Sequence, residues 1–188
     1  ATVVFLFSRS SSGGSSDLAS IAAPTQQKVE GVTLIGCSGS GKTAILHQIS
    51  SGTVPATVPS MVPAYHTVKI PGGKRVQVVD VPGHERLRVS LLQHVKSARG
   101  VVLVVDPSGI KAIKAAAGLL FELLKSDELG AATPLLVFSN KSDLKEAKSS
   151  DRVKGLFQKE VESMRKTAGT MGVADGNKAA VLGDEHFN

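Results

Sequence analysis

Residues 36–43 read Gly-Cys-Ser-Gly-Ser-Gly-Lys-Thr and stand between a short apolar run and a segment of helical pattern. This octapeptide matches G-x-x-x-x-G-K-[ST], the loop that cradles phosphates between a strand and a helix. Its glycines let backbone N–H groups point at phosphate oxygens, and the helix N-terminus adds partial positive charge. Lys42 is expected to reach the terminal phosphates and Thr43 to bind magnesium. The alternative is a chance Gly/Ser-rich turn before a lysine.

Strand-like and helix-like segments alternate around this loop, which predicts a mostly parallel sheet with helices on both faces. Buried strands are expected at residues 29–35, 101–106 and 135–139, and helices at residues 42–51, 87–98, 111–126 and 151–167. Residues 65–70 and 75–80 flank a Pro-Gly-Gly turn and predict one antiparallel hairpin strand. The expected fold class is therefore α/β, of the phosphate-loop type.

Composition restricts the partners. The 188 residues carry a net charge of +6, which suits an anionic partner such as nucleotide phosphate, RNA or acidic lipid. Aromatic residues are 4% and Trp is absent, so no stacking platform for single strands, and no direct nucleic-acid partner, is expected. The single cysteine, Cys37, excludes an intramolecular disulfide framework and a Cys-rich zinc site, and it suits a reducing compartment.

A second motif, Asp80-Val81-Pro82-Gly83-His84, ends the strand expected at residues 75–80. A carboxylate at the carboxyl end of a strand lies at the sheet edge where ligands bind, so Asp80 could hold magnesium through water. Gly83 lets a backbone N–H approach the γ-phosphate without a Cβ in the way. His84 is placed to orient a water molecule against that phosphate. The alternative for His84 is a histidine in a surface turn.

A third motif, Asn140-Lys141-Ser142-Asp143, follows the buried strand expected at residues 135–139. Guanine offers a ring N–H and an exocyclic amine on one edge, and one carboxylate accepts from both, so Asp143 would recognise guanine. Asn140 could tie this loop to the phosphate loop, and the Lys141 stem could cover the base. The alternative is a polar turn that caps the next helix.

The loop at residues 53–63 should supply a magnesium-binding hydroxyl. Thr53, Thr57 and Ser60 are available, and Ser60 fits best by its distance from Lys42 along the chain. For each of the three, a loop hydroxyl that faces water is an equally good interpretation.

The first 28 residues differ from the rest. Residues 1–7 read ATVVFLF and are followed by Arg9 and a Ser/Gly-rich stretch, which is typical of a flexible linker. Seven apolar residues cannot span a bilayer, because a helix needs roughly 20. They could be the end of a membrane anchor or an apolar tail without a role. We therefore expect residues 1–28 to be an anchor end plus linker, and residues 29–188 to be the folded domain.

The three motifs, in this order, resemble those of small GTPases of the Ras and Arf type. Residues 80–88, which read Asp-Val-Pro-Gly-His-Glu-Arg-Leu-Arg, resemble more closely the beta subunit of the signal recognition particle receptor. The segments at residues 158–166 and 182–187 are similar to that family as well. The residues matching its nucleotide-binding motifs are Gly36, Cys37, Ser38, Gly39, Ser40, Gly41, Lys42, Thr43, Gly83, Asn140, Lys141 and Asp143.

The resemblance implies a GTP- and Mg²⁺-binding protein held in the endoplasmic reticulum membrane by an N-terminal helix, with its GTPase domain facing the cytosol. It implies docking of the receptor alpha subunit, indirect association with the ribosome and translocon, and slow hydrolysis. On this interpretation residues 1–7 are the end of that helix. Two other functions compete with this one. The first is a vesicle-trafficking GTPase of the Arf or Sar type, and the second is a phosphate-loop ATPase or kinase. The guanine motif at residues 140–143 argues against the second.

Three departures from the small GTPase pattern stand out. Ser38 carries a side chain where Ras-type enzymes have glycine, so an arginine supplied by another protein would fit poorly. Pro59 stands where a threonine is expected in the first switch loop, so Ser60 would have to bind magnesium in its place. The chain is also expected to stop before the last strand and helix of the fold, so that the fifth guanine-binding motif, a Ser-Ala-Lys type loop, lies outside it.

Overall fold

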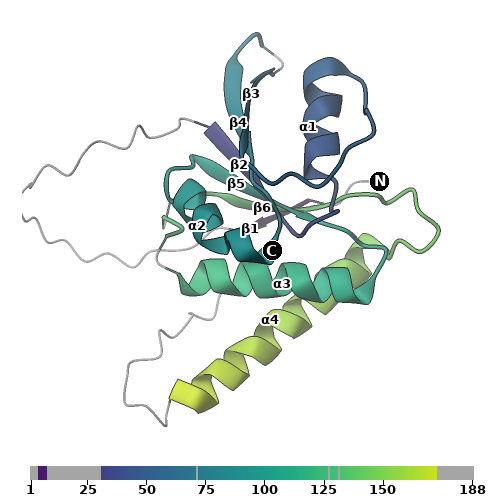
Figure 1. Ribbon diagram of the computed structural model, residues 1–188. Coiled ribbons are helices and arrows are strands. Elements are labelled where there is room, and N and C mark those ends of the chain that lie inside the picture. Colours follow the sequence, from purple (N-terminus) through teal and green to yellow (C-terminus); the bar gives the residue numbers. More distant parts are fainter. Residues whose placement is uncertain (1–3, 8–30, 71, 127, 131, 173–188) are drawn as a thin grey trace, which may run out of the picture.

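A computed structural model of the chain describes residues 4–7, 31–70, 72–126, 128–130 and 132–172. Its strands are β1 (Val4–Phe7), β2 (Gly31–Ile35), β3 (Ala64–Lys69), β4 (Arg75–Asp80), β5 (Gly100–Val105) and β6 (Leu135–Ser139). Its helices are α1 (Lys42–Ser51), α2 (Arg88–Lys96), α3 (Ile110–Lys125) and α4 (Ser150–Gly172), and a 3₁₀ turn, η1 (Glu85–Leu87), precedes α2. The strands form one sheet in the order β1-β6-β5-β2-β4-β3 (Figure 1).

The expected α/β fold is confirmed. Strands β4, β2, β5 and β6 are parallel neighbours, and β3 pairs antiparallel with β4 as the predicted hairpin strand. The central strands are nearly continuous apolar runs because both of their faces are covered by helices. The expected bounds of α1, β4 and β6 agree with the structure. Most other bounds differ by one or two residues, whereas α4 extends five residues beyond its expected C-terminal end.

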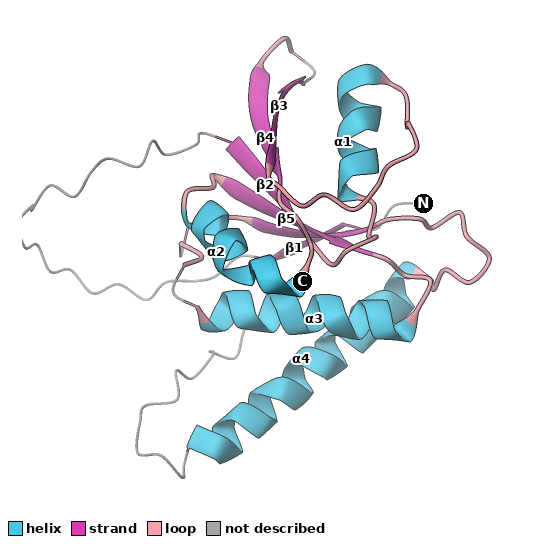
Figure 2. Cartoon of the chain, in the orientation of Figure 1, coloured by secondary structure: helices cyan, strands magenta, loops and turns pink. Residues whose placement is uncertain are grey.

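Helices cover both faces of the sheet (Figure 2). On one face, Leu46 of α1 packs with Leu34 and Val68 of the sheet. On the other face, α2, α3 and α4 enclose a larger apolar core that includes Val105, Leu120 and Phe157. Successive residues of a strand point to opposite faces, which is why neighbouring residues of β5 enter different cores.

Strand β1 is a feature that the sequence analysis did not predict. It pairs antiparallel with β6, from Val4 opposite Phe138 to Phe7 opposite Leu135, at the edge of the sheet. The interpretation of residues 1–7 as the end of a membrane helix is therefore wrong for Val4–Phe7. Four apolar residues look the same in an edge strand and in a membrane helix, so pattern could not distinguish them. The Ser/Gly-rich linker and residues 182–187 lie outside the described residues. Within the described residues, no helix combines the length and apolar character needed to cross a bilayer.

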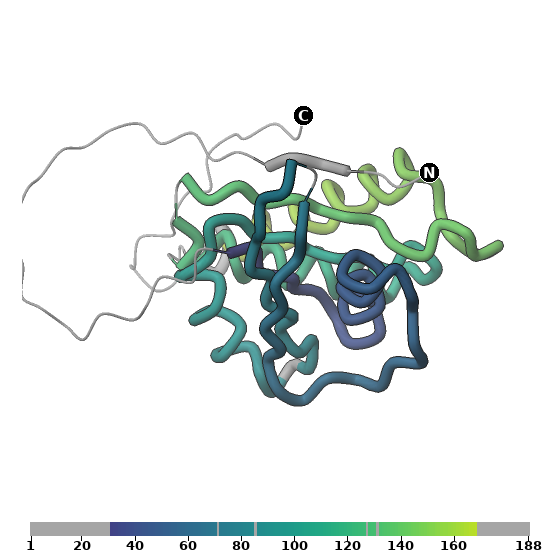
Figure 3. The backbone as a smooth tube through the Cα atoms, turned by 90° about the horizontal axis from the view of Figure 1, so that it is seen from above, coloured from purple at the N-terminus to yellow at the C-terminus, as the bar shows by residue number. Residues whose placement is uncertain are grey.

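The carboxyl ends of β2, β4, β5 and β6 meet at one edge of the sheet, which is where α/β proteins bind ligands. All three sequence motifs follow these strands: residues 36–43 follow β2, residues 80–84 end β4, and residues 140–143 follow β6. The connection between α1 and β3 takes a wide path around the outside of the domain (Figure 3). The fold thus brings the three motif loops and the connection between α1 and β3 to one edge of the sheet.

Candidate nucleotide-binding site

The phosphate loop has the backbone conformation that its glycines allow. Gly36, Gly39 and Gly41 have φ angles of 144°, 76° and 93°, which L side chains rarely adopt. A Cβ at Gly41 would lie 2.3 Å from Nδ2 of Asn140, so glycine also makes room for the neighbouring loop. Helix α1 begins directly at Lys42, which directs its N-terminus at the loop.

Lys42 is buried inside this loop. Its Nζ donates hydrogen bonds to the carbonyl oxygens of Gly36 (2.9 Å) and Cys37 (3.0 Å), and the residue is only 6% exposed. Burial lowers the pKa of Lys42, and electrostatic interactions with Asp80 and Cys37 oppose that shift. The loop therefore holds a buried cation where the sequence motif places the terminal phosphates.

Three oxygen-bearing side chains converge beside Lys42. The Thr43 hydroxyl donates to Oδ2 of Asp80 at 2.5 Å, and Thr43 Oγ1 lies 3.2 Å from Ser60 Oγ. Asp80 is fully buried, and its Oδ1 has no hydrogen-bond partner among the described atoms. A buried carboxylate oxygen without a partner is costly unless it meets a cation or water. Hydroxyl and carboxylate oxygens are the ligands that Mg²⁺ prefers, so these residues fit that ion.

The structure distinguishes the three candidate hydroxyls of the loop between α1 and β3, which are those of Thr53, Thr57 and Ser60. Ser60 contacts Thr43, whereas Thr53 Oγ1 lies 3.1 Å from Ser51 Oγ at the end of α1. Thr57 and Ser60 both line a cleft of about 290 Å³ between the phosphate loop, Gly83 and Lys141. Of these three described residues, only Ser60 lies within hydrogen-bond distance of the Thr43–Asp80 pair, which favours it as the magnesium-binding hydroxyl.

We expect Ser60→Ala to weaken the magnesium dependence of nucleotide binding, because it removes one oxygen from the Thr43–Asp80 cluster. A loss of about 10-fold in apparent Mg²⁺ affinity is the expected size. The measurement is a titration of MgCl₂ against a fluorescent GTP analogue, with Thr53→Ala as the matched control. Equal curves for the two variants would contradict the assignment.

The turn after β4 lies directly on the phosphate loop. A Cβ at Gly83 would lie 2.3 Å from the Gly36 carbonyl oxygen and 2.6 Å from the Ser38 nitrogen. Only glycine allows so close an approach. His84 is exposed, and its Nδ1 accepts a hydrogen bond from the Arg86 backbone N–H at 3.3 Å. His84 does not line the 290 Å³ cleft, whereas it does line a neighbouring cavity with residues 36–38.

The loop after β6 is tied to the phosphate loop by two side chains. Asn140 Nδ2 donates to the Ser40 carbonyl oxygen at 2.9 Å, as expected. Lys141, which has a φ of 55°, donates from Nζ to the Gly39 carbonyl oxygen at 2.6 Å. Asp143 is exposed on the same loop and does not line the 290 Å³ cleft. Two of the three guanine-motif residues, Asn140 and Lys141, therefore hydrogen-bond to the phosphate loop, whereas Asp143 does not line its cleft.

Asp106, at the end of β5, is a site residue that the sequence analysis missed. Its Oδ2 accepts a hydrogen bond from Lys141 Nζ at 2.7 Å, and its Oδ1 accepts from the Ser108 backbone and hydroxyl. Burial alone would raise the pKa of Asp106, but hydrogen bonds from Lys141 and Ser108 outweigh it and lower that pKa. The sequence did contain a signal for Asp106. It directly follows a buried strand, and like Asp80 at the end of β4 it lies at the sheet edge where ligands bind.

Comparison with known proteins adds to this geometry. Residues 27–185 match the family model described as signal recognition particle receptor beta subunit. Curated receptor subunits beta from Homo sapiens and Mus musculus are 34% and 33% identical, each over 72% of this chain and 52% of the relative. The relative from Dictyostelium discoideum is 26% identical over 82% of this chain and 56% of its own length. The chain thus spans about half the length of these relatives.

Solved structures agree. The structure of the mammalian SRP receptor matches with a TM-score of 0.68 and 32% identity, covering 73% of this chain and 76% of that one. The small GTPase Arl6 BBS3 from Trypanosoma brucei, solved with the nucleotide analogue GppNp, matches with a TM-score of 0.60 over 69% of this chain and 77% of that one. At 22% identity, that second match shows the fold alone. The family model, the curated relatives and the receptor structure show that the chain belongs to the signal recognition particle receptor beta subunits.

Proposed function

We propose that this chain binds GTP with Mg²⁺ and that the bound nucleotide controls docking of the receptor alpha subunit. The observation that carries the proposal is the meeting of three motif loops at one sheet edge, with Asn140 and Lys141 bonded to the phosphate loop. Family membership supports the guanine nucleotide and the partner. The phosphate loop alone would suit ATP equally well.

Each site residue has a distinct task in this proposal. Lys42 and the backbone of residues 36–43 hold the phosphates, while Asp143 accepts hydrogen bonds from guanine. Thr43 and Ser60 hold Mg²⁺, and Asp80 holds it through water. When bound, Mg²⁺ supplies positive charge that offsets the phosphate oxygens. Gly83 presents its backbone N–H from the turn that already lies against residues 36–38.

Hydrolysis is proposed to be slow. An arginine finger contributes about 10³ to 10⁵ in rate, and the described cleft of 290 Å³ has no arginine in its lining. His84 is the proposed water-positioning residue, from the exposed turn beside Ser38. The hydrolysis rate is then low because the site binds the nucleotide well but stabilises the transferred phosphoryl group poorly.

The loop that bears Ser60 is suited to conditional docking. Val54, Val58, Met61 and Val62 on this loop are 55%, 81%, 66% and 71% exposed. Apolar side chains gathered on an exposed loop mark interaction sites. A loop held by the nucleotide through Ser60 would present these side chains in one arrangement, and its release would disperse them.

We further propose that docking takes place at the endoplasmic reticulum membrane, with the domain facing the cytosol. Membership of the signal recognition particle receptor beta subunit family supports this placement. Through the alpha subunit, the chain would contribute to delivering ribosomes to the translocon.

The test is recovery of the purified alpha subunit by this chain loaded with GTP, loaded with GDP or free of nucleotide. Recovery should be greatest with GTP, and Met61→Asp should lower it while nucleotide affinity stays unchanged. Ile70→Asp is the matched control, because Ile70 is 39% exposed and lies at the opposite end of β3 from Met61. Equal recovery in all three nucleotide states would refute nucleotide-gated docking.

A further inference from the structure

Helix α2 is anchored in the core from Leu91 onward, whereas its first residues have fewer buried side chains. Leu91 and Val95 are buried in the core, and the Thr33 hydroxyl of β2 donates to the His94 carbonyl oxygen at 3.4 Å. His94 Nε2 also lies 3.1 Å from the Tyr65 hydroxyl of β3. In the first turn, by contrast, Val89 is 73% exposed. Burial therefore fixes the end of α2 that lies away from the nucleotide site.

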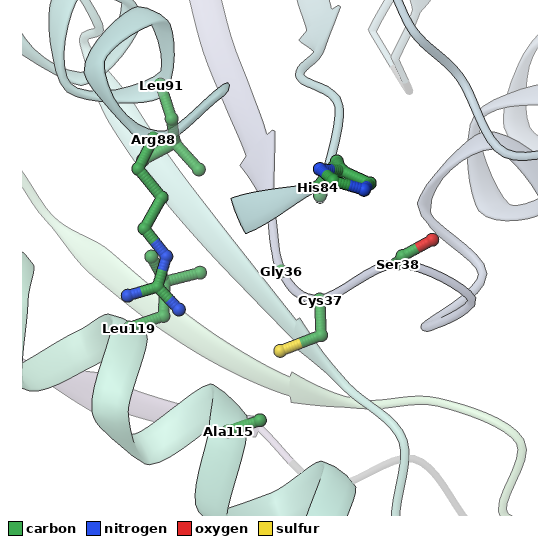
Figure 4. A pocket seen from close by; sticks show the side chains of 9 residues that line it. Gly36, Cys37, Ser38, His84, Arg88, Leu91, Ala115 and Leu119 are labelled. Carbon is green, nitrogen blue, oxygen red and sulfur yellow. The ribbon is translucent and has the colours of Figure 1, made fainter. Parts of the chain in front are cut away.

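A cavity of about 330 Å³ lies where the first turn of α2 faces α3. Residues 36–38, His84, Leu91, Ala115 and Leu119 line it, together with Arg88 (Figure 4). Arg88 extends toward α3 on one side of this cavity, and His84 lies beside Ser38 on the other side (Figure 4). Leu91 packs in the same apolar core as Leu119, but because a cavity supplies no packing, Arg88 at the start of the turn needs another link to α3.

That link is an ion pair. Nη1 of Arg88 donates to Oε1 of Glu122, near the C-terminal end of α3. The side chains of Arg88 and Glu122 are 34% and 49% exposed, so the pair lies at the surface and spans the gap between the two helices. A hydrogen bond between two charged groups is stronger than one between neutral groups.

The ion pair is mechanically close to the phosphate loop. Only four residues separate Arg88 from Gly83, and two hydrogen bonds stiffen them: Leu87 N–H to the His84 carbonyl oxygen at 2.9 Å, and Arg86 N–H to His84 Nδ1 at 3.3 Å. At the other end, Gly83 contacts residues 36–38 so closely that no Cβ would fit. A displacement of the first turn of α2 therefore moves Gly83 and His84 relative to the phosphate loop.

We propose that the Arg88–Glu122 ion pair is a positioning clamp, which keeps the Gly83–His84 turn against the phosphate loop and so favours GTP over GDP. The γ-phosphate is the part of GTP that GDP lacks, and it is the part that the Gly83 N–H would reach. A loose turn then weakens GTP binding and leaves GDP binding unchanged. This inference rests on the proposed function, because it concerns the same nucleotide site.

The test compares Glu122→Gln with Glu128→Gln. Glu128 pairs with Lys96 at 3.1 Å and links the opposite end of α2 to the segment after α3, so it is a matched ion pair outside the nucleotide site. Glu122 is a better choice than Arg88, because Arg88 has a further interaction besides this pair. Glu122→Gln should lower the affinity for a non-hydrolysable GTP analogue by about two- to five-fold, the range of a surface ion pair, with GDP affinity unchanged.

A second measurement does not depend on nucleotide. In the nucleotide-free protein, hydrogen exchange of the peptide spanning residues 81–90 should be faster in Glu122→Gln than in the wild type or Glu128→Gln. Unchanged exchange, or equal losses of GTP and GDP affinity, would overturn the clamp. A wild-type protein that binds no GTP would instead refute the proposed function, and the exchange data would still report whether the pair holds the turn.

Discussion

Lys42→Ala is expected to abolish measurable GTP binding while leaving the domain folded. The Lys42 ammonium is buried within the phosphate loop, where it donates to two carbonyl oxygens at 2.9 and 3.0 Å. A hydrogen bond to a charged group contributes about 1.5–3 kcal/mol, so two such bonds to phosphate oxygens correspond to a loss of about 100-fold or more in affinity. Equilibrium titration with a fluorescent GTP analogue measures the effect.

Folding should survive this substitution because the folded protein gains little from the Lys42 charge. Burial lowers the pKa of Lys42, which means that the folded state disfavours its protonated form. Thermal unfolding of the nucleotide-free variant checks this. Lys69→Ala, an exposed lysine on β3, is the matched control for a lost positive charge. A folded Lys42→Ala protein that binds GTP as tightly as the wild type would show that residues 36–43 are not the site.

Much of this site could be predicted from the sequence because its motifs are local. A phosphate loop needs glycines at fixed positions, and the strand and helix on either side show in the hydrophobic pattern. The same holds for the turn at Gly83 and for Asn140, whose predicted contact with the phosphate loop is present at 2.9 Å. Each of these residues follows a buried strand, and parallel strands bring their carboxyl ends to one edge.

What the sequence could not predict depends on contacts between distant elements. Arg88 and Glu122 are 34 residues apart, and each is an ordinary charged residue on an exposed helical face until the packing of α2 beside α3 is known. Strand β1 is another such case, because its partner β6 begins more than 120 residues later. Spacing from Lys42 already favoured Ser60 over Thr53 and Thr57, but only the path of the loop brings its hydroxyl to Thr43.

Asp143→Asn is expected to change the base that the protein binds. The Asp143 carboxylate is proposed to accept from the ring N–H and the exocyclic amine of guanine, and the asparagine amide can accept only on one side and donates on the other. GTP affinity should fall by about 100-fold or more, because a pair of charge-assisted bonds is lost. Affinity for xanthosine triphosphate should rise, because xanthine has a carbonyl acceptor where guanine has its amine.

The rise in xanthine affinity distinguishes recognition of the base from damage to the loop. Asn140 and Lys141 hold this loop to the phosphate loop through contacts that do not involve Asp143, so the substitution should leave the loop in place. Glu146→Gln removes an exposed carboxylate three residues further along and should change neither affinity. Competition among GTP, ATP and xanthosine triphosphate for one fluorescent probe measures all three preferences. If Asp143→Asn weakens every nucleotide equally, Asp143 supports the loop and does not recognise guanine; if the wild type binds ATP as well as GTP, the site does not select guanine.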